Sequence, residues 1–452
     1  MEHRLKTSLK ISLALALLCA GVAAGAAAAA AMAAPAAPAA LPMQVGSYYT
    51  AWSTERGFRL KQFDQSGAAG RFTFLNYSFA NIYKMADGTY RCDSGRDVKD
   101  AEDGAGMRAT LDYARKFSGD ESVDGSADRG GQPLAGNFNQ LRQLKAHHPK
   151  LKVLIAIGGY EWSRWFSIGS ATQALRKTLV SSCIDMYIKG NLPVLDGHGG
   201  AGAAAGVFDG IDIDWEYPGV PLKPYNTISP NDKKNFTLLL AEFRSQLNAL
   251  GKQTGKRYLL TAAVNSGAKT TDATEPALYA RSLDWINLMT YDFSGAWNKQ
   301  GPTAFHSNLF ADPGSPDADK QSIDTGVQRF IKAGVPSRKL VIGVPFYARG
   351  WSGVPAARYG LYQSATAPAK GFEDGAETYA NIARSPAPKF YHPVTRQLWT
   401  YDKGVFWTYD DPLVIREKAA YARKHKLGGM MSWALDQDDT AFTLSKAMLE
   451  LR

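Results

Sequence analysis

The stretch Phe208-Asp-Gly-Ile-Asp-Ile-Asp-Trp-Glu-Tyr-Pro218 places Asp212, Asp214 and Glu216 at alternate positions of a short apolar segment. In an extended strand, residues two apart point to the same face. The three carboxyl groups therefore share one side of the strand, and the bulky apolar residues between them take the other. Like charges at this spacing repel and raise one another's pKa, which keeps one carboxylic acid protonated near neutral pH. The pattern predicts a proton-donor site.

A solvated edge strand and a calcium-binding loop both fit this acidic row less well. An edge strand can turn alternate acids to water, but it gives no reason for Ile211, Ile213 and Trp215 on the opposite face to be so large and apolar. A calcium-binding loop would be rich in Gly and Asn and shaped like a turn. We therefore assign Trp215 to packing and the acids to chemistry.

The motif Asp209-x-x-Asp212-x-Asp214-x-Glu216 resembles the DxxDxDxE signature of the chitinases of glycoside hydrolase family 18. Other segments resemble strands of that family's barrel in the expected order. They are Asn76–Asn81 for the second strand, Ile155–Gly159 for the third, Met289–Phe293 for the sixth, Gly343–Arg349 for the seventh and Met431–Leu435 for the eighth. The resemblance extends from about Met43 to the last residue.

Short β-rich runs alternate with helical stretches along this chain of 452 residues. The candidate strands are Gln44–Tyr49, Phe72–Phe79, Lys152–Ile157, Val207–Ile213, Tyr258–Ala263, Trp285–Met289, Leu340–Pro345 and Gly429–Trp433. This alternation predicts an α/β fold, a closed parallel (β/α)8 TIM barrel. One helix is marked by Ser229 as its N-cap, Pro230 in its first turn and Gly251 as its stop.

Three segments interrupt the alternation. Gly88–Gly136 is polar and Gly-rich, and we expect an elaborated loop. Asp196–Gly206 precedes the fourth strand, and we expect a flexible connection without a chemical task. Roughly 80 aromatic-rich residues separate the seventh strand from the eighth, which is too long for an ordinary connection. They resemble the small α+β insertion of one branch of the family, which we place at 351–406, with the barrel at 41–350 and 407–452.

Residues 1–40 combine Arg4, Lys6 and Lys10 with an Ala/Leu-rich stretch and small residues before Pro35, which is typical of a secretory signal peptide and leader. Without them the net charge falls from +10 to +8, because Glu2 leaves as well. No basic block or nucleic-acid motif accompanies this charge.

Cys92 and Cys183 remain after the leader, and an oxidising compartment permits a bridge between them. Two buried free thiols are the alternative, and we expect the free thiols because spacing alone gives no proximity.

The resemblance implies a mechanism. Glu216 would be the general acid for the glycosidic oxygen, and the acetamido oxygen of the substrate would attack the anomeric carbon to give an oxazolinium ion. Asp214 would orient the acetamido N–H, Asp212 would share a proton with Asp214, and Tyr291 would hydrogen-bond the acetamido group. Asp209, out of phase with the others, would be structural.

The resemblance also implies the substrate-binding residues. Trp433 would form the floor of the cleavage subsite, since sugar C–H groups stack on indole. The other candidates are Met289, Asp292, Tyr347 and Arg349 around the same sugar, and Tyr48, Tyr160, Trp162 and Trp297 at neighbouring subsites. One departure is that Ala156 stands where the family usually has a Ser that assists the aspartates.

The sequence thus predicts a secreted enzyme, extracellular or periplasmic, that cleaves β-1,4-linked N-acetylglucosamine chains with retention. Its partners would be chitin or chito-oligosaccharides, with no nucleic acid and no membrane after removal of the signal. We expect a monomer with no metal and no cofactor. The alternatives are an endo-β-N-acetylglucosaminidase on N-glycans and a non-catalytic chitin-binding lectin.

Overall fold

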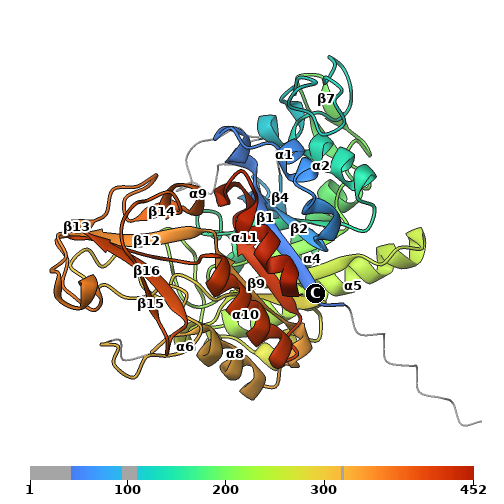
Figure 1. Ribbon diagram of the computed structural model, residues 1–452. Coiled ribbons are helices and arrows are strands. Elements are labelled where there is room, and N and C mark those ends of the chain that lie inside the picture. Colours follow the sequence, from blue (N-terminus) through green and yellow to red (C-terminus); the bar gives the residue numbers. More distant parts are fainter. Residues whose placement is uncertain (1–41, 94–108, 317–319, 452) are drawn as a thin grey trace, which may run out of the picture. The chain divides into compact units, whose positions relative to one another are not determined.

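Eight parallel strands form a closed barrel in the computed structural model, which describes residues 42–93, 109–316 and 320–451 (Figure 1). Each strand pairs with the next barrel strand in the chain, and the last pairs with the first. The strands are β1 (Gln44–Thr50), β2 (Phe74–Ala80), β5 (Lys152–Gly158), β8 (Gly210–Asp214), β9 (Leu259–Asn265), β10 (Trp285–Met289), β11 (Leu340–Pro345) and β18 (Gly429–Trp433). The predicted (β/α)8 barrel is confirmed.

Helices follow the strands, as expected of this fold. They are α1 (Leu60–Gln65), α2 (Gly136–His147), α3 (Phe166–Gly169), α4 (Gln173–Cys183), α5 (Asp232–Thr254), α6 (Ala268–Asp272), α7 (Pro276–Tyr279), α8 (Ile323–Lys332), α10 (Pro412–Lys424) and α11 (Thr443–Met448). One apolar cluster includes outward-facing strand residues such as Ile211 and helix residues such as Phe236, and a second one fills the barrel interior. Within the described residues, none of the helices has the length and apolar character of a membrane-spanning segment.

The fourth barrel strand starts later than predicted. It begins at Gly210 instead of Val207, because Asp209 forms part of the approach to the strand. The carboxylate of Asp209 accepts a hydrogen bond from the backbone N–H of Val153 at 2.9 Å and pairs with Lys145 at 2.8 Å. These contacts give Asp209 a structural position at the start of β8, away from the row of acids.

The marked helix is also longer and later than predicted. Its buried stripe contains the expected apolar residues Phe236, Leu239, Leu240, Phe243 and Leu247. The helix begins at Asp232, and Asn231 is its N-cap. The backbone N–H of Ser229 donates to the carboxylate of Asp232 at 2.8 Å, so Ser229 lies before the helix and is not its cap. It ends at Thr254, and Gly255 follows with a φ of +69°, the left-handed conformation that favours glycine. Gly251 lies inside the helix, where a Cβ would meet the carbonyl oxygen of Lys256 at 2.5 Å.

The segment 196–206 is partly ordered as a hairpin instead of a flexible connection. β6 (Leu192–Leu195) pairs with β7 (His198–Gly200) in antiparallel fashion. The backbone N–H of Gly199 donates to the carbonyl of Pro133 at 2.7 Å, which ties the hairpin to the long segment before α2. Gly199 is required here, because its φ is +96° and a Cβ would meet the carbonyl oxygen of Pro193.

Cys92 and Cys183 form a disulfide, so the expectation of free thiols was wrong. Cys92 ends β4 (Tyr90–Cys92), at the start of the predicted Gly88–Gly136 loop, and β4 pairs with β3 (Ile82–Lys84) before it in a hairpin. The hairpin packs on the end of α4, where the backbone N–H of Cys92 donates to Ser182 Oγ at 3.0 Å. The two Cα atoms are 4.9 Å apart although 91 positions separate them in the sequence.

An antiparallel sheet stands between the seventh and eighth barrel strands (orange in Figure 1). Its strands are β12 (Tyr347–Ser352), β13 (Ala367–Pro368), β14 (Ala376–Thr378), β15 (Lys389–His392), β16 (Gln397–Asp402) and β17 (Val405–Tyr409), with the short helix α9 (Tyr379–Ile382). The sheet therefore extends beyond 351–406 at both ends. Because β12 follows directly on β11, this sheet starts at the carboxyl end of a barrel strand.

Candidate active site

The three acids of the motif lie at the carboxyl end of β8, where barrel enzymes carry their chemistry. Asp212, Asp214 and Glu216 are 0%, 3% and 8% exposed. Trp215 between them points outward, where its ring stacks on Phe166 at a centroid distance of 5.3 Å. The alternation predicted for this stretch is confirmed.

Asp212 lies deepest and accepts three hydrogen bonds. Tyr48 Oη donates to its Oδ2 at 2.7 Å, Asn287 Nδ2 donates to its Oδ1 at 3.1 Å, and Thr261 Oγ1 donates to the same oxygen. Burial raises the pKa of Asp212 to about 6, and the three donors oppose this rise. Asp212 is therefore a fixed carboxyl group that can hold a proton under mildly acidic conditions.

Asp214 is the least satisfied of the acids. Its Oδ1 is buried and has no hydrogen-bond partner among the described residues. Burial, together with the neighbouring charges of Glu216 and Asp212, raises its pKa well above the ordinary value. A buried acceptor without a donor is costly, so Asp214 is prepared to receive a donor from a bound molecule.

Glu216 has a pKa close to neutral pH, which suits a proton donor. Burial raises its pKa to about 7; a hydrogen bond from Tyr217 opposes the rise, and the charges of Asp292 and Glu161 add to it. The backbone N–H of Glu216 donates to Ser163 Oγ at 2.9 Å, and this hydroxyl donates to the carbonyl of Gly159 at 2.9 Å. Ser163, which sequence reasoning missed, therefore links the end of β5 to the proton donor.

Asp292 and Arg349 form a close ion pair beside these acids. Arg349 Nε and Nη2 donate to the two carboxylate oxygens of Asp292 at 2.8 and 2.9 Å. Burial alone would raise the pKa of Asp292, but the guanidinium outweighs it and holds the pKa well below the usual range. Asp292 has a φ of +58°, an uncommon conformation for a residue with a side chain.

The predicted aromatic residues divide into a buried group and an exposed group. Tyr48, Met289, Tyr291 and Tyr347 belong to the apolar cluster inside the barrel, and the partly buried Trp162 and Trp433 pack against it. The Trp433 ring stacks on Phe79 at 5.6 Å and lies 5.4 Å from the Tyr48 ring. Tyr48 is 1% exposed, and its hydroxyl donates to Asp212, so it lies beneath the acids.

Tyr160 and Trp297 are the exposed members, at 50% and 61%. A cation covers one face of each ring. Lys223 Nζ lies 3.8 Å from the Tyr160 ring centroid, and the Arg349 guanidinium carbon lies 5.4 Å from that of Trp297.

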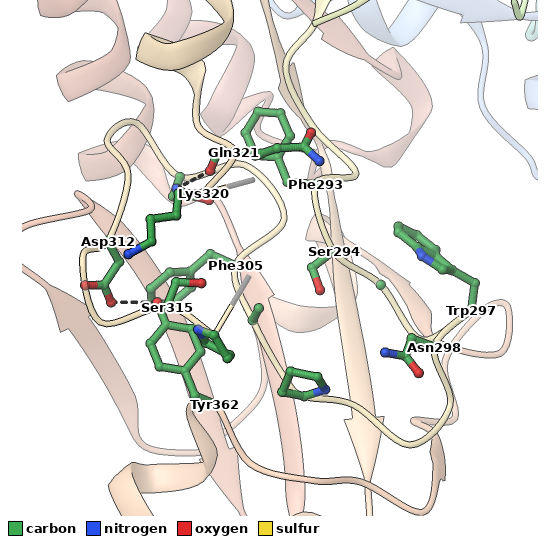
Figure 2. Close-up of a pocket in the computed structure, with 15 residues that line it drawn as sticks. Phe293, Ser294, Trp297, Asn298, Phe305, Asp312, Ser315, Lys320, Gln321 and Tyr362 are labelled. Atoms are coloured by element: carbon green, nitrogen blue, oxygen red, sulfur yellow. Dashed lines mark hydrogen bonds between the residues drawn. The ribbon is translucent and has the colours of Figure 1, made fainter. Parts of the chain in front are cut away.

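A cavity of about 370 Å³ adjoins Trp297 in the segment after β10 (Figure 2). Its lining includes Phe305, Tyr362 and Asp312, and none of the acids of the motif is among the lining residues. We therefore define the site by the carboxylates and the barrel cluster. The cavity lies outside this site and adjoins it at Trp297.

Comparison with known proteins gives consistent matches. Residues 44–438 match the family described as glycosyl hydrolases family 18. The chain is 34% identical over 437 residues to Chitinase A1 of Niallia circulans and 36% identical over 399 residues to Chitinase C of Streptomyces lividans, covering 90% and 86% of this chain. It spans only 58% and 56% of those relatives. The catalytic domain of psychrophilic chitinase B from Arthrobacter TAD20 matches with a TM-score of 0.85 and 40% identity, over 90% of this chain and 94% of that one.

Proposed function

Because this chain belongs to the glycosyl hydrolases of family 18, we propose that it hydrolyses the β-1,4 linkages of chitin and chito-oligosaccharides. The observation that carries the proposal is the buried row Asp212, Asp214 and Glu216, in which burial raises the pKa of Glu216 to about 7. A carboxylic acid of this kind can donate a proton at neutral pH, as acid hydrolysis of a glycoside requires. The named relatives are chitinases, which supports this substrate.

In the proposed mechanism Glu216 protonates the glycosidic oxygen as the bond to the anomeric carbon breaks. The acetamido oxygen of the same sugar attacks that carbon and forms an oxazolinium ion. Asp214 accepts the acetamido N–H through its unpartnered oxygen and balances the positive charge. Glu216 then takes a proton from the incoming water, which opens the ring with retention of configuration. Asp212, held by three donors, takes the proton that it shares with Asp214, so that Asp214 is ionised when the positive charge develops.

We further propose that one sugar binds over the barrel cluster. Trp433 forms the floor, Met289 lies under the sugar, and Tyr291 hydrogen-bonds the acetamido group. Asp292, Tyr347 and Arg349 contact the same unit. The exposed rings of Tyr160 and Trp297, together with Tyr48 and Trp162, provide neighbouring subsites. The antiparallel sheet would raise one wall of the groove.

The leader and the boundaries belong to the same proposal. We propose that residues 1–40 direct secretion of a monomeric enzyme, which acts outside the cell or in the periplasm. The barrel would comprise 41–350 and 407–452, with the insertion at 351–406, although the first and last strands of the insertion's sheet, β12 and β17, reach to Tyr347 and Tyr409.

Product analysis with Glu216→Gln beside the wild type tests the function. We expect wild type to release short N-acetylglucosamine oligomers from chitin hexasaccharide, and Glu216→Gln to lose at least about 100-fold in kcat with KM within about threefold. Since Glu216 must be protonated to act, the wild-type rate should fall as the pH rises through about 7. Cleavage of a high-mannose glycopeptide alone would indicate the N-glycan alternative. Binding of oligomers without cleavage of either substrate would indicate a lectin.

A further inference from the structure

His306 is a fully buried imidazole in the segment between β10 and α8. Neither of its ring nitrogens has a hydrogen-bond partner among the described residues. Burial lowers the pKa of the imidazole, so the ring is neutral near pH 7 and carries one N–H donor and one acceptor. Unsatisfied buried donors are rare in native proteins, so this one points to a partner that it reaches in another state of the site.

The imidazole faces the carboxylate of Asp292. Nδ1 of His306 lies 3.7 Å from Oδ1 of Asp292, which is longer than a hydrogen bond. Arg349 already binds both oxygens of this carboxylate, and the Tyr347 ring packs against the imidazole with centroids 5.3 Å apart. A small movement would therefore bring a second donor onto Asp292.

A buried ion pair anchors the segment that carries His306. Ser307 Oγ donates to Asp410 Oδ1 at 2.9 Å, and Lys418 Nζ donates to Ser307 Oγ at 2.9 Å. Lys418 and Asp410 also pair with each other, and both side chains are 0% exposed. The backbone N–H of Phe293, next to Asp292, donates to the carbonyl of His306 at 3.1 Å. The backbone that carries the imidazole is thus held beside Asp292.

The charged groups that act on His306 come from three elements. They are Asp292 after β10, Arg349 on β12 and Asp410 after β17. The negative charges of Asp292 and Asp410 favour the tautomer of His306 whose N–H points toward a carboxylate. Asp292 in turn acts on Glu216, since its negative charge is one of the causes that raise the pKa of Glu216.

We propose that His306 is a positioning residue: when a sugar occupies the site, its Nδ1–H donates to Asp292 and holds that carboxylate beside the substrate. The inference rests on the proposed function, because it concerns the geometry during turnover. Hydrogen bonds of this kind are often long in a free enzyme and tighten in the substrate complex. With its second donor, Asp292 would keep its place next to Glu216 while the sugar enters.

Three substitutions separate this role from simple packing. His306→Asn keeps an N–H close to the position of Nδ1, His306→Gln places one near Nε2, and His306→Phe keeps the ring without a donor. His198 is the matched control, because it is also buried and its Nδ1 contacts the carbonyl of Gln132 at 2.7 Å on the β6–β7 hairpin. For every variant kcat, KM, the pH profile of kcat/KM and the thermal midpoint are measured, with whichever of the two substrates the wild type cleaves.

We expect His306→Gln and His306→Phe to lose about 10-fold or more in kcat, since a displaced carboxylate disturbs a positioned substrate. Their alkaline limb should move to lower pH, because a displaced Asp292 raises the pKa of Glu216 less. His306→Asn should stay within about threefold of wild type and keep the alkaline limb. His198→Asn should change the thermal midpoint alone.

Wild-type rates and profiles in His306→Phe would overturn the positioning role. So would equal losses in all three His306 variants that follow the thermal midpoint, because packing alone accounts for them. If the wild type cleaves neither substrate, this result contradicts the proposed function and, with it, the positioning role. If the wild type cleaves a substrate and His306→Phe has the same kcat and pH profile, this result contradicts the positioning role alone.

Discussion

At the scale of single residues, Asp212 is a carboxylic acid that the barrel buries completely although an ionised carboxylate favours water. Its pKa is about 6 in the fold and near 4 in an unfolded chain. A raised pKa means that the stability this group contributes is present at low pH and is lost as the pH rises through about 6. The acid that serves the site therefore makes the protein less stable at neutral and alkaline pH.

We expect Asp212→Asn to remove this pH-dependent loss. Asn can still accept from Thr261 and Asn287, and it cannot ionise. The free energy of unfolding of the variant minus that of wild type should be larger at pH 8 than at pH 4.5, by on the order of 2 kcal/mol. Urea unfolding at the two pH values measures this difference. Asp374→Asn, at a carboxylate that is 65% exposed, should show no such change, and equal differences for Asp212→Asn at both pH values would contradict the argument.

The acids of the site could be predicted from the sequence, but their partners could not. Alternation along one strand places Asp212 and Asp214 on one face without knowledge of any other strand. The donors Thr261 and Asn287 lie on β9 and β10, and only the closed barrel brings them to Asp212. A polar residue at an inward position of an apolar strand was the one signal that could have found them. Ala156 pairs in register with Asp212, so the family's missing hydroxyl would have lain next to this acid.

At the scale of elements, the disulfide joins the β3–β4 hairpin to the end of α4. It closes a segment of 91 positions, and a loop of that length corresponds to roughly 4.5 kcal/mol of stability in the chain-entropy description. We expect the double substitution Cys92→Ala and Cys183→Ala to lower the free energy of unfolding by about this amount. Because the bridge lies outside the row of acids, kcat at 25 °C should change little. Urea unfolding and a rate assay check both, and an unchanged urea midpoint would contradict the role of the bridge.

Helix and hairpin details show where local sequence signals fail. Gly251 resembles a C-terminal stop signal in the sequence, yet it lies inside α5. A glycine is needed there because a Cβ would meet the backbone carbonyl oxygen of Lys256. The glycines of 196–206 have the composition of a flexible linker, yet Gly199 is bonded to Pro133 in a paired strand. In both cases a distant part of the chain, which local patterns do not contain, decides why the glycine is needed.

At the scale of the whole molecule, the order of strands and helices was predictable because the alternation of periods two and 3.6 repeats around the barrel. The way in which the antiparallel sheet joins the barrel was not predictable. β12 supplies Tyr347 and Arg349 to the site, and Gln397 of β16 donates to Asp410 at 3.0 Å, which pairs with Lys418 on α10. The sheet is thus bonded to barrel elements through buried polar groups.

We therefore expect the barrel and the antiparallel sheet to unfold together. Breaking the buried pair of Asp410 and Lys418 on one side would leave an unpaired charge on the other, so partial unfolding is costly. Calorimetry should show one transition in which the calorimetric and van't Hoff enthalpies agree. Phe406→Ala in the sheet and Phe236→Ala on α5 each leave a cavity, worth about 3–5 kcal/mol, and both should lower this same transition. A split into two transitions, with Phe406→Ala moving only one of them, would show instead that the sheet is an independent unit.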